Sequence, residues 1–471
     1  MELSKPDPQR WLALALLCAA QFIVILDTSI IGVALPAIQT QLGFSPGGLS
    51  WIFNAYVIAF GGLLLLGGRL SDLFGARRIF TTGFVILTAA SLLAGLANSQ
   101  ELLLAGRALQ GVGAALIAPS ALTIVMRLFA HNGAELGKAF GFWGAAAAAG
   151  GSAGVFLGGV ITEWLAWPWT FLINVPLGLL VLALIPAVLR KSPRSTGRVD
   201  WFGAITVTGA LVTLVYAIVT AETVGWASAQ ILILLAVAAI LLVIFLVIQA
   251  ARREPLLPLA IFKAPNLAAG NLVMALLGAA WIPLWFFLNL YLQQILGLSA
   301  LSSGLALLPM TVMIMVVMVG FSGRLIGRFG PKANLIIGLL LMGAALLLFA
   351  NLPTDGSFWV NVLPASLLAA LGMALAYIPA TMSGMSGAKP EETGLASGLI
   401  NTTYQVGSAV GLAVMVALAA SVAPHAGGET ADLLPGFQAA FFGAAVAAFL
   451  GAAATLVFVR GSAPQREVPV G

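Results

Sequence analysis

Charged residues are rare in this sequence, and so are cysteine and histidine. Only 8% of the 471 residues are Asp, Glu, Lys or Arg, compared with about 25% in soluble domains, which excludes an ordinary soluble protein. The single cysteine, Cys18, cannot form a disulfide within the chain. Neither His131 nor His425 lies within an apolar run, which excludes a histidine relay. The sequence has no metal-ligand cluster, nucleophile–base pair or nucleotide-binding loop, so we expect no enzyme, no ATP-driven pump and no metal or organic cofactor.

Long apolar runs dominate the chain instead. It is 61% hydrophobic with a mean hydropathy of +1.07, and apolar stretches of about 20 residues, each sufficient to cross a bilayer, recur along almost its whole length. In lipid such runs form helices, because the backbone must satisfy its own hydrogen bonds. The sequence therefore predicts an all-α membrane protein with fourteen transmembrane helices. The expected spans are 11–38, 48–68, 79–98, 101–127, 137–162, 167–190, 201–221, 228–250, 267–294, 301–323, 333–352, 358–380, 395–421 and 437–460.

Basic residues mark one side of the predicted membrane. If the N-terminus is cytoplasmic, every Lys and Arg outside the spans lies on the cytoplasmic side, and the opposite side carries acidic residues such as Glu101, Glu163 and Asp355. This positive-inside asymmetry predicts a multi-pass protein of the cell membrane with both termini in the cytoplasm. It also accounts for the pI of 9.6 without a nucleic-acid partner. We expect a monomer whose partners are lipid and small-molecule substrates.

Two charged side chains lie inside the predicted spans, away from the span ends. Asp27 lies in the first span, where a carboxylate costs about 2.5–3.5 kcal/mol on insertion scales, and Arg107 lies in the fourth. At a rise of about 1.5 Å per residue, both fall at comparable depth in the outer part of the bilayer, so the two side chains can meet. A nearby guanidinium and burial act on a carboxyl group in opposite directions, which suits a group that binds and releases a proton. We predict proton coupling through Asp27 and Arg107; the alternative is a structural salt bridge.

A short segment occurs twice in the same orientation. Residues 68–77 (GRLSDLFGAR) follow the second span, and residues 323–332 (GRLIGRFGPK) follow the tenth. Parallel repeats are found in transporters built from two like halves. A plain duplication of six spans would place the second copy after the eighth span, so we infer an inserted helix pair. The predicted division is an N-terminal six-helix bundle (1–199), the inserted pair (200–254) and a C-terminal six-helix bundle (255–471).

Several motifs together resemble the major facilitator superfamily, and within it the fourteen-span drug:proton antiporters. The pattern Gly68-x-Leu70-x-Asp72-x-x-Gly75-x-Arg77-Arg78 is similar to the signature loop between spans 2 and 3. Residues 107–113 (RALQGVG) and 154–159 (GVFLGG) are similar to the span 4 motif and the span 5 antiporter motif. Segments typical of fourteen-span members are 26–36 (LDTSIIGVALP), 167–178 (WPWTFLINVPLG), 291–293 and 394–398. Gly32 departs from the usual Asn, and Val155 from the usual Pro.

The resemblance implies roles for two of these motifs. The loop from Gly68 to Arg78, including Gly75, is implied to gate the cytoplasmic side. In it, Asp72 is expected to cap or adjoin a helix N-terminus, and Arg77 and Arg78 to pair across that face; anchoring by the positive-inside rule is the alternative. In span 5, a stripe of small residues lets a neighbouring helix approach closely, and we expect this packing to lie between halves that slide. The stripe consists of Gly150, Gly154 and Gly158, with Gly159 beside it.

Polar and aromatic residues at helical spacing are the candidate substrate contacts. An apolar pocket with few polar groups accepts varied amphipathic molecules, and aromatic rings can hold cations. Packing against lipid or protein is the alternative for each aromatic residue. Asn401 and Gln405 are the stronger candidates, because amides within spans usually face the protein interior. The full set is Gln110, Trp143, Trp285, Asn289, Asn401, Tyr404 and Gln405, with Trp143 implied by the resemblance alone.

These features predict a proton-coupled secondary active exporter, an antiporter that works by alternating access. Its substrates are expected to be small amphipathic or lipophilic drugs, cations among them, with the proton as the coupling ion. The alternative is a dedicated proton-coupled exporter of a single natural product or metabolite. A non-transporting membrane scaffold is a remote alternative, because a scaffold has no need of a costly buried Asp27.

Overall fold

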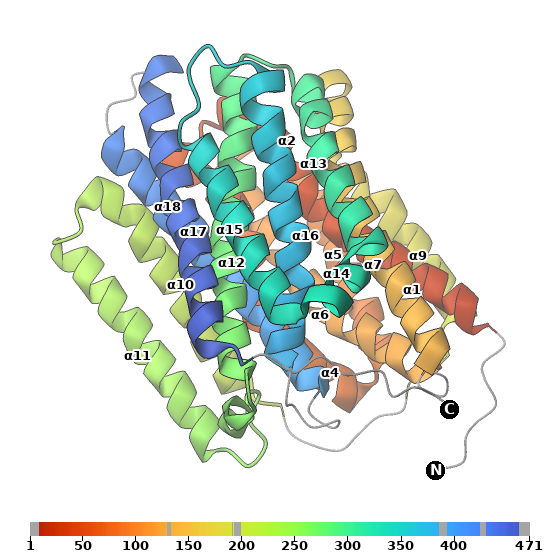
Figure 1. The fold of residues 1–471 in the computed structure, drawn as a ribbon. Coiled ribbons are helices and arrows are strands. Elements are labelled where there is room, and N and C mark those ends of the chain that lie inside the picture. Colours follow the sequence, from red (N-terminus) through yellow and green to blue (C-terminus); the bar gives the residue numbers. More distant parts are fainter. Residues whose placement is uncertain are drawn as a thin grey trace.

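The computed structural model describes residues 9–129, 133–190, 192, 199–385, 393–423 and 430–460. Within these ranges all regular structure is helical, with no strand, and the long helices run side by side as a bundle (Figure 1). Fourteen helices in the described part are long and apolar enough to cross a membrane. The predicted all-α fold with fourteen spans is confirmed.

The first part of the chain forms helices that match the first six predicted spans. Their bounds are α1 Arg10–Ser29, α2 Ile31–Leu42, α3 Pro46–Leu49, α4 Trp51–Phe74, α5 Ala76–Gly95, α6 Gln100–Phe129, α7 Gly133–Trp164, α8 Trp169–Leu172 and α9 Asn174–Val188. The first predicted span, 11–38, is interrupted at Ile30 and continues as α2. Pro36 lies inside α2, where its ring removes one backbone hydrogen bond and disfavours a straight helix.

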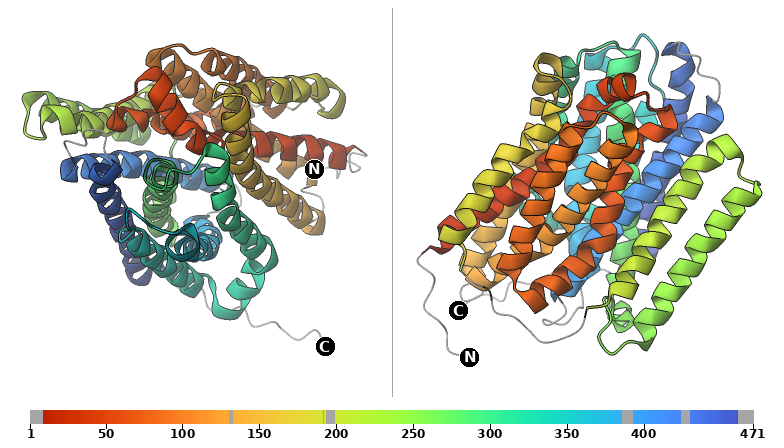
Figure 2. Two further views of the ribbon diagram at one scale, coloured as in Figure 1. Left: turned by 90° about the horizontal axis from the view of Figure 1, so that it is seen from above. Right: turned by 180° about the vertical axis from the view of Figure 1, so that it is seen from behind.

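Two long helices follow, α10 Trp201–Val224 and α11 Ala229–Ala251. They form a hairpin at one side of the bundle (Figures 1 and 2). In it, α10 packs against α11, α4 and α17. The remaining elements are η1 Leu259–Lys263, α12 Leu267–Leu290, η2 Tyr291–Ile295, α13 Ala300–Gly320, α14 Ser322–Phe329, α15 Pro331–Phe349, η3 Phe358–Val362, α16 Leu363–Met385, α17 Thr393–Val422 and α18 Thr430–Phe458. The division at residues 199 and 254 stays a prediction.

The repeated segment has the same backbone in both copies. Each copy is helical up to its last glycine, Gly75 (φ 93°) in the first and Gly330 (φ 79°) in the second, and a new helix starts at the next residue. A residue with a side chain rarely adopts such φ values. The expected loop is therefore mostly helix: Asp72 lies in the last turn of α4, and α5 has no side-chain cap. The helix continues past the end of the apolar run, and the expectation that Asp72 caps or adjoins a helix N-terminus stays a prediction.

The two halves meet at the end of the bundle that carries Glu101, Glu163 and Asp355, here called the acidic end. Side-chain Nε2 atoms of Gln293 and Gln294 donate to Val33 O and Gln39 Oε1, both at 2.9 Å, and Leu301 N donates to Glu163 Oε2 at 3.3 Å. These residues are on η2 and α13 on one side and on α2 and α7 on the other. The opposite end, which carries Arg69, Arg328 and Arg460, is called the basic end.

The helices α7 and α13 approach each other closely toward the acidic end. There a Cβ at Gly159 would lie 2.8 Å from Ala300 O, and one at Gly304 would lie 2.7 Å from Val155 O. Toward the basic end, Gly141 of α7 and Gly320 of α13 have no other residue within 4 Å of such a Cβ.

The glycine stripe of α7 packs within the first half, not between the halves. A Cβ at Gly150, Gly154 or Gly158 would lie 2.6–2.7 Å from Phe22 O, Ser29 Cβ or Ile30 O, all in the first span. A spacing of four keeps these three glycines on one helix face, and that face is turned to α1. Only Gly159, which is rotated around the helix from Gly158, faces α13. The prediction of a stripe between sliding halves is therefore wrong for its three main members.

Candidate functional site

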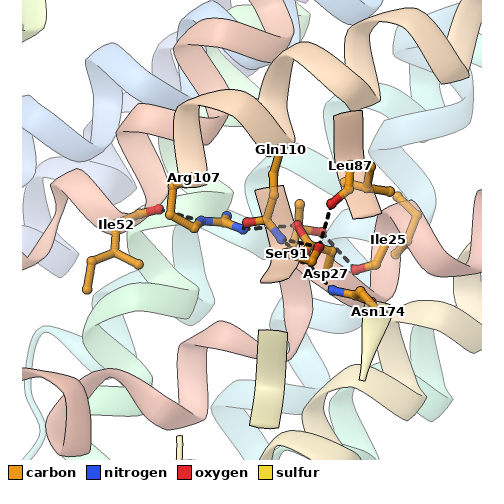
Figure 3. Close-up of polar contacts among 9 residues, drawn as sticks. Ile25, Asp27, Ile52, Leu87, Ser91, Arg107, Gln110 and Asn174 are labelled. Atoms are coloured by element: carbon orange, nitrogen blue, oxygen red, sulfur yellow. Dashed lines mark hydrogen bonds and ion pairs between the residues drawn. The ribbon is translucent and has the colours of Figure 1, made fainter. Parts of the chain in front are cut away.

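Asp27 is the centre of a buried polar network inside the first half (Figure 3). Its Oδ2 accepts a hydrogen bond from Arg107 Nη1 at 2.9 Å. Its Oδ1 accepts two more, from Gln110 Nε2 at 2.7 Å and from Asn174 Nδ2 at 2.6 Å. Asp27, Arg107 and Gln110 have no exposed surface, and Asn174 is 1% exposed. The structure thus brings together the two charges that the depth argument placed at the same level.

Arg107 is held by three neighbours besides Asp27. Its Nε donates to Ile52 O at 2.9 Å, and its Nη1 donates to Gln110 Oε1 at 2.8 Å. Its guanidinium lies over the ring of Tyr56, 4.5 Å from the centroid, in the geometry of a cation–π contact. These contacts fix the guanidinium in one place, which a bare ion pair between long side chains does not do.

The sequence of α6 explains why two polar groups reach Asp27 from one helix. Arg107 and Gln110 are three residues apart and therefore lie on the same face. Small residues on both sides let α6 approach its neighbours: a Cβ at Gly106 would lie 2.9 Å from Ala94 Cβ of α5, and one at Gly111 would collide with Tyr56 O of α4. The glycines of the span 4 motif thus bring α6 close to α4 and α5.

Gln110 extends the network to α5. Its Nε2 also donates to Ser91 Oγ at 2.9 Å, and Ser91 Oγ donates to Leu87 O at 2.7 Å. Gln110 was predicted as a substrate contact; the structure places it next to Asp27, and a role in binding substrate stays a prediction.

Sequence reasoning missed Asn174 and Ser91 as members of this site. Asn174 is the first residue of α9 and lies inside the segment 167–178 that carried part of the family resemblance. The rule that selected Asn401 and Gln405, that amides within spans face the protein, would have selected Asn174 as well. Ser91 gave no signal, because serine within a span commonly bonds to its own helix.

Three polar atoms beside the ion pair have no hydrogen-bond partner among the described residues. They are Arg107 Nη2, Asn174 Oδ1 and Tyr56 Oη. Buried polar groups are normally satisfied by protein or by ordered water, so these atoms are places where a water molecule or a rearranged side chain can bond. The arrangement can hold a carboxylate in place and can exchange hydrogen bonds around it.

The predicted gating residues lie at the basic end. Asp72 and Arg78 are exposed and Gly75 is buried at the turn, while a Cβ at Gly68 would touch only Pro119, at 3.8 Å. Arg77 N donates to Ser192 Oγ at 3.1 Å. The described residues show no ion pair for Arg77 or Arg78; instead Arg69 pairs with Glu254, just after α11. A gating role for these residues stays a prediction.

The other substrate candidates are spread over both halves. Trp143 on α7 is half-buried in the first half. In the second half, Trp285 packs edge-to-face on Trp281 at 6.0 Å, and Tyr404 does so on Tyr377 at 5.9 Å. Gln405 is half-buried against Gly61 of α4. Asn401 is exposed, and its Nδ2 donates to Ser397 O of its own helix; binding of substrate by any of these residues stays a prediction.

Asn289 fills the space that a side chain at position 32 would need. It is 1% exposed, its Nδ2 donates to Trp285 O, and its Oδ1 has no partner in the described part of the chain. A Cβ at Gly32 would lie 2.9 Å from Asn289 Nδ2. The polar group that the family usually carries on the first span is therefore replaced here by an amide from α12.

Comparisons with known proteins agree with this architecture. A model described as the Major Facilitator Superfamily matches residues 17–412. The chain is 39% identical over 438 residues to a cephamycin export protein of Amycolatopsis lactamdurans, covering 92% of this chain and 89% of that protein. It is 38% identical over 415 residues to a puromycin resistance protein of Streptomyces alboniger, covering 87% and 82%. A crystal structure of a nucleoside transporter has a TM-score of 0.69 at 13% identity, covering 96% of this chain and all of that one, and shows likeness of fold alone.

Proposed function

The chain belongs to the major facilitator superfamily, and we propose that it is a proton-coupled exporter dedicated to one natural product or a narrow group of them. The relatives support this reading, because each is named for a single antibiotic that it exports or to which it gives resistance. They support it better than the broad multidrug function that the sequence alone favoured. The observation that carries the proton-coupling part of the proposal is the buried network of Asp27.

Asp27 is suited to carry the proton for a physical reason. An ionisable group within a span is costly and is functional by default, and Asp27 has a cation and two amides around it and no exposed surface. Protonation of its carboxyl group removes the charge that Arg107 now balances, and the hydrogen bonds around both must then rearrange. Such a change can favour one of two packed arrangements over the other.

The closed acidic end supports alternating access. In the described conformation the halves touch at that end. If the basic end is cytoplasmic, as the charge pattern predicts, these contacts close the outer side, as alternating access requires of a state that takes up its substrate from the cytoplasm. One proton moving inward supplies about 2.3 kcal/mol per 100 mV, which sustains roughly a fifty-fold gradient of a neutral product.

The test is substrate-dependent proton movement in vesicles. Vesicles containing the protein and a pH-sensitive dye are given an inside-acid gradient, and single antibiotics are added in turn. Wild type should collapse the gradient with one compound or one chemical group of compounds, and Asp27→Asn should not respond to it. Asp355→Asn, which removes an acid outside the spans, is the matched control and should behave as wild type.

Two outcomes would contradict the proposal in different ways. Equal collapse by wild type and Asp27→Asn would remove Asp27 as the proton carrier. Collapse with many unrelated lipophilic compounds would favour multidrug export over a dedicated product. Growth of cells that express the protein, measured against the same panel of antibiotics, gives an independent reading of the substrate range.

A further inference from the structure

A small cavity lies at the basic end of the second half, away from Asp27. Its volume is about 110 Å³, and its walls come from four helices that start or end there. Asn266 precedes α12, Lys332 is in the first turn of α15, Ser383 is near the end of α16, and Arg460 follows α18. All four helices begin or end a candidate membrane span within two residues of the cavity, so the cavity lies at the membrane boundary.

Hydrogen bonds to the backbone hold this cavity in shape. Asn266 Nδ2 donates to Arg460 O at 3.0 Å, and Arg460 N donates to Asn266 Oδ1 at 2.7 Å, so the end of α18 is fastened to the start of α12. Lys332 Nζ donates to Leu456 O at 2.9 Å, which leaves two of its three N–H groups for another acceptor. The side chain of Lys332 and the backbone of Arg460 are thus anchored beside the same space.

Among the described residues, no acidic side chain is paired with the cations at this place. Among the described residues from 255 onward, the basic residues Lys263, Arg324, Arg328, Lys332 and Arg460 share the basic end, and the acidic ones, Asp355 and Asp432, belong to the opposite end. The described part of the chain shows no ion pair for any of these five cations. The first half differs, because there Arg10 pairs with Glu135 and Arg69 with Glu254.

Two further groups in the cavity can donate hydrogen bonds. Ser383 is 6% exposed and lines the cavity, and its hydroxyl makes no hydrogen bond to any described residue. The first turn of α15 starts at Pro331 after Gly330, which offers no capping side chain. The N–H groups of a first helical turn have no partner within the helix and favour an anion. The cationic and hydroxyl side chains among the lining residues suit an oxyanion.

We propose that this cavity binds a phosphate group, and its position at the membrane boundary points to the headgroup of an anionic phospholipid as the carrier. Basic pockets between helices at the cytoplasmic side of a membrane protein are suited to such headgroups. Lys332 and Arg460 supply the charge, and Ser383 and the start of α15 supply the neutral donors. A bound headgroup joins the first residues of α12 and α15 to the last turns of α16 and α18.

The proposal is tested by lipid binding to the purified full-length protein. Native mass spectrometry in detergent measures the binding of phosphatidylglycerol and of phosphatidylcholine, with inorganic phosphate as a competitor. The pocket variant is Lys332→Gln with Arg460→Gln. The control variant, Arg324→Gln with Arg328→Gln, removes the same charge from the same end outside the cavity. We expect the pocket variant to bind phosphatidylglycerol about 30-fold more weakly, at roughly a tenfold loss for each 1.4 kcal/mol and about 1 kcal/mol for each basic residue.

The arms of this experiment separate the possible results. Tighter binding of phosphatidylglycerol than of phosphatidylcholine, lost in the pocket variant and kept in the control, supports the site. Displacement of the lipid by millimolar inorganic phosphate supports the phosphate site and makes the free ion a ligand in its own right. Equal losses in both variants, or equal binding of both lipids, overturn the proposal. If the pocket variant does not fold, the test uses Ser383→Leu, which fills the cavity and keeps every charge. This variant must weaken the binding of phosphatidylglycerol and leave that of phosphatidylcholine unchanged.

Discussion

Removing Arg107 and Asp27 together should destabilise the protein less than the sum of the two single removals. In Arg107→Gln the Asp27 carboxyl group stays fully buried and keeps only the hydrogen bonds from Gln110 and Asn174. Breaking a buried ion pair by removing one partner costs about 3–5 kcal/mol, because the other charge is left without compensation. Asp27→Asn likewise leaves the Arg107 guanidinium as a buried charge without a counter-charge. Arg107 keeps its hydrogen bonds to Ile52 O and Gln110 Oε1.

The double variant Asp27→Asn with Arg107→Gln contains no buried charge. Neighbouring residues in one network typically show coupling energies of about 0.5–3 kcal/mol, and a fully buried pair belongs at the upper end of that range. We therefore expect the double variant to lose about 3 kcal/mol less than the sum of the two single variants. Reversible unfolding by urea in mixed micelles, followed by tryptophan fluorescence, measures the four free energies.

The exposed pair of Arg69 and Glu254 provides the control cycle. Their side chains are 30% and 48% exposed, and exposed pairs contribute about 0–1 kcal/mol, so the same cycle there should give a small coupling energy. Additive losses at Asp27 and Arg107 would refute the reasoning, since they would mean that the two groups are not a charged pair in the folded protein. Proton exchange that persists in the double variant would instead establish the pair as a structural salt bridge.

Three other predictions follow from the packing. Gly158→Leu should lower the thermal midpoint by the equivalent of about 1–3 kcal/mol, because its side chain would be overpacked against Ile30 O. Gly151→Leu should be tolerated, since the nearest atom lies 3.9 Å from a Cβ at that position. Equal losses in both variants would contradict the assigned helix face. Gly32→Asn should clash with Asn289, so Asn289→Ala should restore the thermal midpoint of Gly32→Asn; absence of rescue would mean that the two side chains do not compete for one space. Asp200 is 1% exposed, accepts hydrogen bonds from Gly203 N and Gln249 Nε2, and pairs with Arg252. Asp200→Ala should therefore speed amide hydrogen exchange in α10 and α11 by about tenfold or more. Exchange in α12 should stay unchanged.

The position of the ion pair could be predicted from the sequence because charge inside a span is costly. Only two such residues were present, and counting the residues from the ends of their helices placed both at the same depth. The amide of Asn174 carries no comparable penalty, so it did not stand out from the other polar residues in the spans. Depth along a helix can be counted, whereas the rotation of α9 that points Asn174 at Asp27 depends on packing.

The two incorrect predictions have related causes. A spacing of four identifies a helix face, but nothing in Gly150, Gly154 and Gly158 says which helix lies against it. The end of the second apolar run was equated with the end of a helix, although residues such as Arg69 and Leu70 continue a helix outside lipid as well as inside it. The helix α4 ends at Gly75, where φ is positive, and not where the residues change from apolar to polar.

The structure also bears on whether substrate and proton compete directly for Asp27. Both carboxylate oxygens of Asp27 accept hydrogen bonds from protein, and no surface of the residue is exposed. A bulky product cannot reach the carboxyl group unless these bonds first break. Five residues further along the first span, however, Asn289 of α12 occupies the space that a Cβ at Gly32 would need. Under the proposed coupling, a rearrangement at Asp27 can therefore reach the second half through the first span, and this geometry favours indirect coupling over competition for one carboxylate.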